Sequence, residues 1–367
     1  MRRTRLIVML VVALSRGAAH AADYAVGADL SFLKQAEDRG TVFKDGGEAR
    51  PGLRIFKDHG YNWVRLRLFH SPKELPNDLA YTTALAKEAK ALGFKFLLNF
   101  HYSDTWADPG HQSTPAAWAN DSLSQLEADI YSYSAKIVRD LVRQGTPPDM
   151  VQTGNEVNGG FLWPTGLDYG SASAWPTFGA LLKSAIAGVK SADPRAQIAL
   201  HIANAADWGG VEWWYDNAAA QGVPFDVIAL SYYSYWHGYL DELQTTLDNT
   251  AARYGKPIVL AETAYPWTLA SGDPTASLSF STASALETGY PATPAGQQAM
   301  IRDTLSIVQA VPNGLGLGAF YWEPTWTVVK GNGWDPTDPS SGDGWENQAM
   351  FDYNDTALPV ISDYKPR

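Results

Sequence analysis

Short apolar runs alternate with amphipathic stretches along most of the chain. The runs are continuous in Val, Ile, Leu, Ala and Phe, as in strands that are buried on both faces. They predict eight strands, at Tyr24–Ala28, Asn62–Leu68, Lys95–Phe100, Met150–Thr153, Gln197–His201, Val227–Ser231, Ile258–Glu262 and Leu317–Trp322. Apolar residues spaced by three and four between them predict helices, at Leu79–Leu92, Ser122–Gln144, Trp175–Ser191, Val211–Gln221, Leu240–Tyr254 and Gly296–Gln309.

Eight strands that alternate with helices predict a (β/α)₈ TIM barrel, which we expect to fill residues 23–367 as one α/β domain. The chain has no Pro/Ser linker that would divide it. The competing fold is a doubly wound open sheet, which usually carries a glycine-rich turn after its first strand. Here Asp29-Leu30-Ser31-Phe32 follows that strand, so the barrel is favoured.

Two long irregular segments follow the last two strands, at Thr263–Thr293 and Glu323–Ala349. Both are rich in Gly, Pro, Ser, Thr and Asp. Long connections in a compact domain usually have a function. In a barrel they would lie on the catalytic face, where they could wall a cleft open to a long polymer.

The N-terminus has the pattern of an export signal. Arg2, Arg3 and Arg5 precede the apolar run Leu6–Leu14, and Ala19-His20-Ala21 supplies a cleavage pattern of small residues. We therefore expect residues 1–22 to be a signal peptide and the mature protein to be exported, to the periplasm or outside the cell. The alternative is an amphipathic or core helix.

Composition excludes several classes of function. Removal of the signal segment takes away four arginines and no acidic residue, so the formal charge falls from −11 to −15. Such an acidic chain is not expected to bind nucleic acid or an anionic membrane through charge. The absence of cysteine excludes disulfides, thiol nucleophiles and thiolate metal sites. The 14 Trp, 18 Tyr and 13 Phe suit a surface that stacks on sugar rings, or a plain aromatic core.

Two predicted strands end on a glutamate, Glu156 after the fourth and Glu262 at the end of the seventh. The carboxyl ends of barrel strands face one cavity, so the two side chains should meet. Two carboxyl groups across a glycosidic bond are the working parts of a glycosidase. Glu156, next to Asn155, fits the acid/base, and Glu262 fits the nucleophile. A single strand-end glutamate would more often be a solvated or salt-bridged group.

Other strand ends supply candidates that could orient the nucleophile or support the transition state. Arg65 and Arg67 alternate with apolar residues, so both should face the same side of the second strand. A cation near Glu262 would keep that group ionised, although either arginine could instead form a structural ion pair. Tyr233 could donate to the nucleophile, and Asn155 to a sugar hydroxyl. His101 ends the third strand.

Candidate substrate-binding residues come mostly from the aromatic loops. Asp104 and Trp106 follow His101 in a segment dense in groups that bind sugars, and Trp322, Trp326 and Trp345 lie at or beyond the last strand. Each tryptophan could equally pack in the core. No His-x-His pair of a metal-dependent barrel hydrolase is present, so metal catalysis is not expected.

These motifs together resemble glycoside hydrolase family 53, the endo-β-1,4-galactanases. The matching segments run in order over the chain, at Gly27–Ser31, Val64–Arg67, His101–Pro109, Gly154–Glu156, Leu162–Pro164, Ser231–Tyr233, Glu262–Trp267, Phe320–Pro324, Gly344–Ala349 and Phe351–Asp352. The run Ser-Asp-Thr-Trp-Ala-Asp-Pro, together with the two glutamates, is the most specific part. Trp267 enters the set of candidate substrate-binding residues through this resemblance.

The resemblance implies a retaining endo-acting barrel enzyme, with Glu156 as acid/base, Glu262 as nucleophile, and Arg65 and Tyr233 orienting the nucleophile. The implied substrate is β-1,4-galactan, such as the side chains of type I pectic arabinogalactan. We expect no cofactor and a monomer. Structural calcium, which some bacterial relatives carry, would fall at residues 271–275, where one carboxylate remains and the histidine is missing.

Two other functions fit the same glutamate pair. One is a retaining barrel glycanase that acts on mannan, xylan or glucan, because the chemistry at C1 is shared. The other is a non-catalytic barrel that binds glycans through its aromatic residues. Release of new reducing ends from a panel of polysaccharides separates the three functions.

Overall fold

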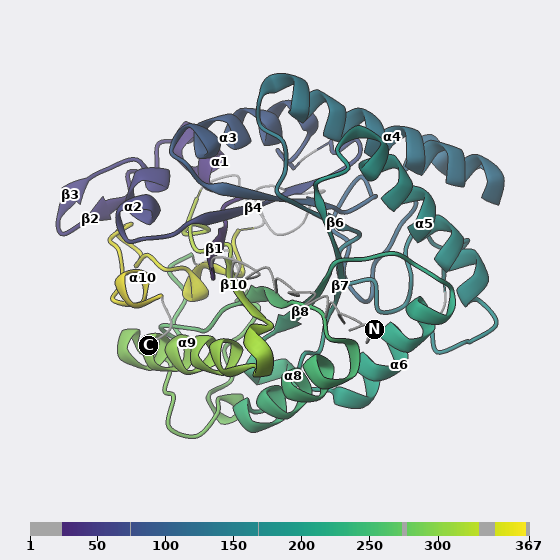
Figure 1. The fold of residues 1–367 in the computed structure, drawn as a ribbon. Coiled ribbons are helices and arrows are strands. Elements are labelled where there is room, and N and C mark those ends of the chain that lie inside the picture. Colours follow the sequence, from purple (N-terminus) through teal and green to yellow (C-terminus); the bar gives the residue numbers. More distant parts are fainter. Residues whose placement is uncertain (1–23, 74, 168, 274–276, 330–341, 365–367) are drawn as a thin grey trace, which may run out of the picture.

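The computed structural model describes residues 24–73, 75–167, 169–273, 277–329 and 342–364. Its centre is a closed barrel of eight parallel strands in the order β1-β10-β9-β8-β7-β6-β5-β4, and helices surround it (Figure 1). The barrel strands are β1 (Ala25–Asp29), β4 (Trp63–Leu68), β5 (Lys95–Phe100), β6 (Met150–Thr153), β7 (Gln197–Ile202), β8 (Val227–Tyr232), β9 (Ile258–Thr263) and β10 (Gly316–Trp322). The expected (β/α)₈ barrel is confirmed.

Six longer helices form most of the outer layer. They are α3 (Leu79–Ala91), α4 (Leu123–Gln144), α5 (Trp175–Ala192), α6 (Trp208–Ala220), α8 (Leu240–Tyr254) and α9 (Pro294–Ala310). Each lies within a few residues of the helix that the apolar spacing predicts. Thr293 is the N-cap of helix α9, and its hydroxyl accepts the Gly296 N–H. The helix then begins with Pro294, and proline is favourable at the first helical position.

The segment between β1 and β4 contains elements that the sequence pattern did not predict. They are α1 (Leu33–Asp38), the hairpin β2 (Lys44–Asp45) and β3 (Glu48–Ala49), and α2 (Gly52–Asp58). Helices and strands this short carry too few residues to produce a clear period. The remaining short elements are α7 (Ser234–His237), α10 (Val360–Asp363), η1 (Ala116–Trp118), η2 (Ala283–Ala285), η3 (Pro312–Gly314) and η4 (Glu346–Gln348).

The barrel interior changes from apolar to polar along its axis. Its lower part is a buried cluster made of Ala25, Trp63, Leu97, Met150, Ala199, Val227, Ala229, Val259, Ala261, Leu317 and Phe320. One step further along β4 the interior holds Arg65, and then Arg67, both fully buried. The alternation that predicted a shared face for the two arginines is confirmed, because both contact Asp29 of β1.

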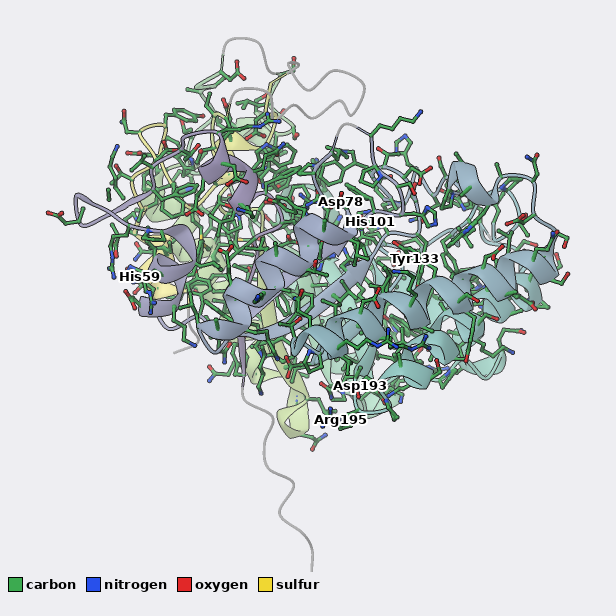
Figure 2. The ribbon with its side chains drawn as sticks, turned by 90° about the horizontal axis from the view of Figure 1, so that it is seen from above. His59, Asp78, His101, Tyr133, Asp193 and Arg195 are labelled. Carbon is green, nitrogen blue, oxygen red and sulfur yellow. The ribbon has the colours of Figure 1, made fainter. Side chains whose placement is uncertain are left out.

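The polar part of the interior lies at the carboxyl ends of the strands. In Figure 2, His101 at the end of β5 lies toward the upper part of the barrel, whereas Asp193 and Arg195 before β7 lie at the opposite edge. The site residues therefore gather at one end of the barrel, as the fold requires.

Strand β9 carries an extra residue just before its glutamate. Leu230 of β8 pairs with Leu260, but the next residue, Ser231, pairs with Glu262. The pairing with β10 shows the same irregularity, because Ala319 pairs with Leu260 and Tyr321 with Thr263. This is a β-bulge, which changes the direction of the side chains that follow it. It allows Ala261 and Glu262, although adjacent in sequence, both to face the interior.

Residues 1–22, the expected signal peptide, lie outside the described part of the chain. No helix of the described residues has the length and apolar character needed to cross a bilayer.

Candidate active site

A cleft of about 350 Å³ opens at the carboxyl end of the barrel. Both predicted catalytic glutamates line it. Its other lining residues are His101, Trp106, Ala107, Asp108, Pro109, Asn155, Ala203, Asn204, Tyr233, Trp236, His237, Trp322 and Trp345.

Glu156 lies in a constrained turn that follows β6. Gly154 and Glu156 both have positive φ angles, of 102° and 47°, and the second is uncommon for a residue with a side chain. Neighbouring groups hold this backbone in place. Nε2 of Gln112 donates to the carbonyl oxygen of Asn155 at 2.7 Å, and the N–H of Val157 donates to the carbonyl of His201 at 2.9 Å. Such local strain is common at functional sites.

The surroundings of Glu156 favour its protonated form. Burial raises the pKa of its carboxyl to about 8, and the charges of Glu262 and Asp108 act in the same direction. The neighbouring Ser231 hydroxyl and the charge of Arg65 oppose the shift. A carboxyl group that stays protonated near neutral pH can act as a general acid.

Glu262 is held by two donors. Nη2 of Arg65 lies 2.8 Å from its Oε1, and the hydroxyl of Tyr233 donates to its Oε2 at 3.0 Å. Burial raises the pKa of Glu262, whereas Arg65 and Tyr233 lower it by stabilising the charged form. Glu156 has no comparable cation contact. The pair therefore keeps its proton preferentially on Glu156, and Glu262 is the ionised member.

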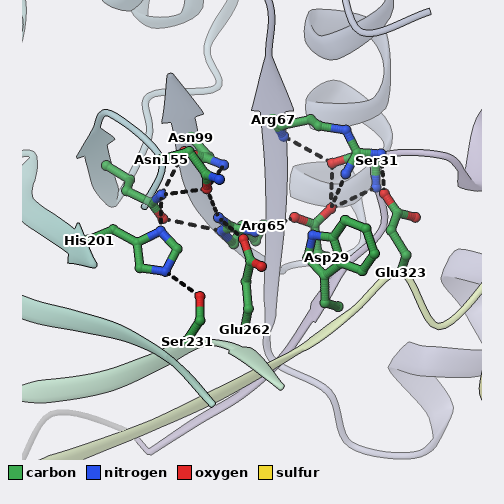
Figure 3. A network of polar contacts seen from close by, with 12 residues as sticks. Asp29, Ser31, Arg65, Arg67, Asn99, Asn155, His201, Ser231, Glu262 and Glu323 are labelled. Carbon is green, nitrogen blue, oxygen red and sulfur yellow. Dashed lines mark hydrogen bonds and ion pairs between the residues drawn. The ribbon is translucent and has the colours of Figure 1, made fainter. Parts of the chain in front are cut away.

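Arg65 connects Glu262 to the barrel wall (Figure 3). Its Nη1 donates to Asp29 at 2.7 Å, its Nη2 to Asn155 at 2.8 Å, and its Nε to Gln152 at 3.2 Å. A buried guanidinium needs several acceptors to offset the cost of its desolvation. The planar fork of arginine supplies donors in the fixed directions that these partners require.

Asn155 and His101 lie where the sequence placed them, in the cleft. Oδ1 of Asn155 accepts from Arg65 and from Asn99, and its Nδ2 donates to the carbonyl of Ala107 at 2.8 Å. Nδ1 of His101 accepts the Ala107 N–H at 3.0 Å. Burial and the nearby arginines lower the pKa of His101 well below its usual value, so the ring is neutral and its proton is on Nε2.

Three of the predicted tryptophans line the cleft: Trp106, Trp322 and Trp345. The guanidinium of Arg67 lies 4.5 Å from the Trp106 ring centroid and forms an ion pair with Glu323. Trp326 is fully buried and stacks on Trp106 at 6.0 Å. It supports the aromatic wall from behind and does not line the cleft.

Asp104 and Trp267 lie outside the cleft lining. The carboxylate of Asp104 accepts the backbone N–H groups of Ser71 and Ala116, at 3.0 and 2.8 Å, and so shapes its loop. The Trp267 ring packs on Tyr353, with 4.7 Å between the ring centroids, and the backbone N–H of Trp267 donates to the carbonyl of Asn347. Their polar and aromatic character reflects loop architecture, which sequence alone does not distinguish from sugar contact.

Several cleft residues were not singled out from the sequence. Trp236 in α7 and Asn204 after β7 are exposed residues of the lining, and Asn204 has a positive φ of 70°. The interior residues Asp29, Gln152, His201 and Ser231 join the hydrogen-bond network. The position of Ser231 and His201 at strand ends was the available signal, since the fold turns such residues toward the cleft.

The loop where the family resemblance places calcium offers few ligands among its described residues. Only Asp273 supplies a carboxylate in residues 271–273, and Pro274 and Thr275 lie outside the described residues. Oε1 of Glu346 accepts from Ser271 Oγ and from the N–H groups of Gly272 and Asp273, at 2.8, 2.6 and 3.0 Å. No group of three His, Asp or Glu residues suited to a metal occurs in the described part of the chain.

A closed (β/α)₈ barrel with two buried carboxyl groups at its catalytic end defines a barrel glycoside hydrolase. Residues 25–363 match the sequence profile of glycosyl hydrolase family 53, and the chain belongs to that family. The solved catalytic domain of an Ignisphaera aggregans member superposes with a TM-score of 0.87 at 39% identity, covering 93% of this chain and 95% of that one.

Several relatives carry galactanase names. The arabinogalactan endo-β-1,4-galactanase of Thermothelomyces thermophilus is 34% identical over 92% of this chain and 97% of its own length. The enzyme of the same name from Cellvibrio japonicus is 33% identical over 98% of this chain and 95% of its own length.

Proposed function

We propose that this protein is an exported endo-β-1,4-galactanase that cleaves type I arabinogalactan by retaining double displacement. The single observation that carries the proposal is the buried pair of Glu156 and Glu262, in which two donors stabilise the charge of Glu262 and burial raises the pKa of Glu156. Membership of the family and the names of the relatives support the choice of galactan.

In the first step, the ionised carboxylate of Glu262 attacks the anomeric carbon while Glu156 gives its proton to the departing oxygen. A covalent glycosyl-enzyme forms and the leaving sugar departs as an alcohol. Arg65 and Tyr233 hold both oxygens of Glu262, so the nucleophile is oriented before substrate binds. Their contacts also disfavour protonation of the nucleophile.

In the second step, Glu156 is ionised and takes a proton from water as the water attacks the anomeric carbon. The bond to Glu262 breaks and the configuration of the sugar is retained. This sequence needs the two carboxyl groups about 5–5.5 Å apart, so that no water fits between nucleophile and sugar. The effect of the Glu262 charge on the pKa of Glu156 supports such proximity.

The substrate groove is assigned to the aromatic cleft. Trp106, Trp236 and Trp322 offer apolar faces for the C–H faces of galactose rings, with Trp345 buried beside Trp322, and Asn155 and His101 offer polar contacts for hydroxyl groups. Export, to the periplasm or outside the cell, is also part of the proposal. It is supported by the N-terminal sequence pattern.

The test is product analysis after brief digestion of linear β-1,4-galactan, with mannan, xylan and cellulose as parallel substrates. We expect oligosaccharides released from galactan alone, with the β-anomer formed first in proton NMR. Glu156→Gln and Glu262→Gln should each lower the rate by several orders of magnitude while remaining folded. Release from another polymer, initial formation of the α-anomer or a near-normal Gln variant would contradict the proposal.

A further inference from the structure

His201 is buried behind the cleft, and both of its ring nitrogens lie within hydrogen-bonding distance of partners. Nδ1 lies 2.7 Å from Nε2 of Gln152 and 3.3 Å from the backbone nitrogen of Glu156. Nε2 lies 2.8 Å from the hydroxyl of Ser231 on β8 (Figure 3). The ring thus connects the barrel interior to the backbone of the proposed acid/base, Glu156, and to the hydroxyl of Ser231.

The direction of these hydrogen bonds is fixed by Arg65. A guanidinium can only donate, so the Gln152 oxygen must face the Nε of Arg65, at 3.2 Å. The amide nitrogen of Gln152 then faces Oδ1 of Asn99 and Nδ1 of His201, both at 2.7 Å. The Glu156 N–H also points at this ring nitrogen, so Nδ1 of His201 is an acceptor.

His201 therefore carries a single proton, on Nε2. Burial and the charge of Arg65 lower the pKa of His201 well below its usual value, so the ring is neutral. Its Nε2–H donates to the oxygen of Ser231. Because that oxygen accepts from His201, the hydroxyl proton of Ser231 is directed elsewhere, and the Glu156 carboxyl is its neighbour.

We propose that Ser231 donates its hydroxyl proton to the carboxylate of Glu156, and that Ser231 and His201 are positioning residues that orient the acid/base and favour its ionised form. This inference deepens the proposed function and rests on it. The chain of donors begins at Arg65, which also holds Glu262. One guanidinium thus acts on both carboxylates, directly on the nucleophile and through Gln152, His201 and Ser231 on the acid/base.

Ser231 offsets groups that keep Glu156 protonated. The groups facing Glu156 come from several elements: Glu262 on β9, Asp108 after β5, Arg65 on β4, Tyr233 after β8, and the neutral rings of His201, His101 and His237. Arg65 and the Ser231 hydroxyl stabilise the charged form. A donor at this point matters for the second step, in which Glu156 must be ionised to accept a proton from water.

The test compares Ser231→Ala with wild type in the pH profile of kcat/KM. On galactan, loss of the donor should move the alkaline limb upward by about one pH unit, because protonated Glu156 persists to higher pH. On a 2,4-dinitrophenyl galacto-oligosaccharide, whose leaving group needs no proton, kcat/KM should change little. A purely structural role of Ser231 would lower kcat/KM equally for the two substrates at every pH.

Ser134→Ala is the matched control, since Ser134 is a buried serine on α4 that bonds to Tyr102 and lies outside the cleft lining. It should keep the wild-type profile. Carbon-13 NMR titration of the Glu156 carboxyl supplies a readout that is independent of activity. The pKa that it measures should be higher in Ser231→Ala than in wild type. A profile and titration that stay at wild type, or move downward, would overturn the inference. Absence of galactan hydrolysis by wild type would refute the proposed function, yet the titration would still decide the role of Ser231.

Discussion

The phenol of Tyr233 donates a 3.0 Å hydrogen bond to Oε2 of Glu262, from a residue that directly follows β8. Arg65 holds the other oxygen, so neither oxygen of the proposed nucleophile is without a donor. Burial, and next the charge of Glu262, raise the pKa of Tyr233 well above its usual value, which keeps the phenol a donor over the working pH range.

Tyr233→Phe should lower kcat/KM by about 10–100-fold, because it removes one charge-stabilising hydrogen bond from Glu262. The acidic limb of the profile should move to higher pH, since the nucleophile becomes easier to protonate. Tyr215→Phe is the control, because the Tyr215 hydroxyl bonds to the Leu200 carbonyl away from the cleft. Equal profiles for the two variants would argue against the assigned role.

Arg65→Lys should be both inactive and unstable. A lysine cannot reach Asp29, Gln152, Asn155 and Glu262 together, so buried acceptors and charges lose their partner. We expect kcat/KM to fall on the order of 1000-fold and unfolding free energy by about 3 kcal/mol. In contrast, Arg253→Lys alters an exposed pair with Asp216 and should be close to neutral in urea unfolding.

Glu156→Gln should be more stable than wild type at alkaline pH. The pKa of Glu156 in the folded protein, about 8, lies above its ordinary value near 4.5. The wild type therefore keeps full stability below about pH 4.5 and loses part of it as the pH rises toward 8, since the unfolded chain binds fewer protons there. The amide is free of this penalty.

Thermal unfolding from pH 4 to 9 measures this difference. The gap in stability should be smallest at pH 4 and reach on the order of 4 kcal/mol by pH 8. Glu48→Gln, on the exposed hairpin strand β3, should show no comparable trend. A gap that stays constant with pH would mean that folding does not raise the pKa of Glu156.

Trp236→Ala should weaken substrate binding with little effect on stability. Trp236 lines the cleft, packs on Tyr233 and is 53% exposed. Loss of one stacking contact should raise KM for galactan up to about 10-fold, with kcat little changed. Tyr131→Ala, 40% exposed on α4 and outside the cleft lining, should leave KM unchanged. Buried Trp345→Ala should instead cost about 3–5 kcal/mol of stability.

The eight strands could be predicted because buried parallel strands are continuous apolar runs, and the observed ends differ from the predicted ones by one residue at most. The catalytic candidates followed from the fold, since Glu156 and Glu262 stand where strands end. Arg65 and Tyr233 followed from alternation and from resemblance to the family. Each of these residues lies in or beside the cleft, as expected.

The aromatic residues were harder to place. Trp326 and Trp267 are of a residue type that often binds sugars. In the structure, however, Trp326 packs against Trp106, and Trp267 packs against Tyr353. Trp236 went unnoticed because α7 is a single turn with no periodic pattern. The conformation of a loop decides whether an aromatic side chain points into the cleft. Loop sequences have no periodic pattern from which the direction of a side chain could be predicted.

The bulge at Ala261 resets the phase of strand β9. Before the bulge, Val259 and Ala261 alternate with Leu260 and face the barrel interior. After it, the alternation is displaced by one residue, and this displacement turns Glu262 inward. A regular strand of the same sequence, without the bulge, would instead point this carboxylate into the helical layer without altering the lower strand. Any chimaera that grafts this barrel floor onto another catalytic rim must therefore retain that one-residue offset.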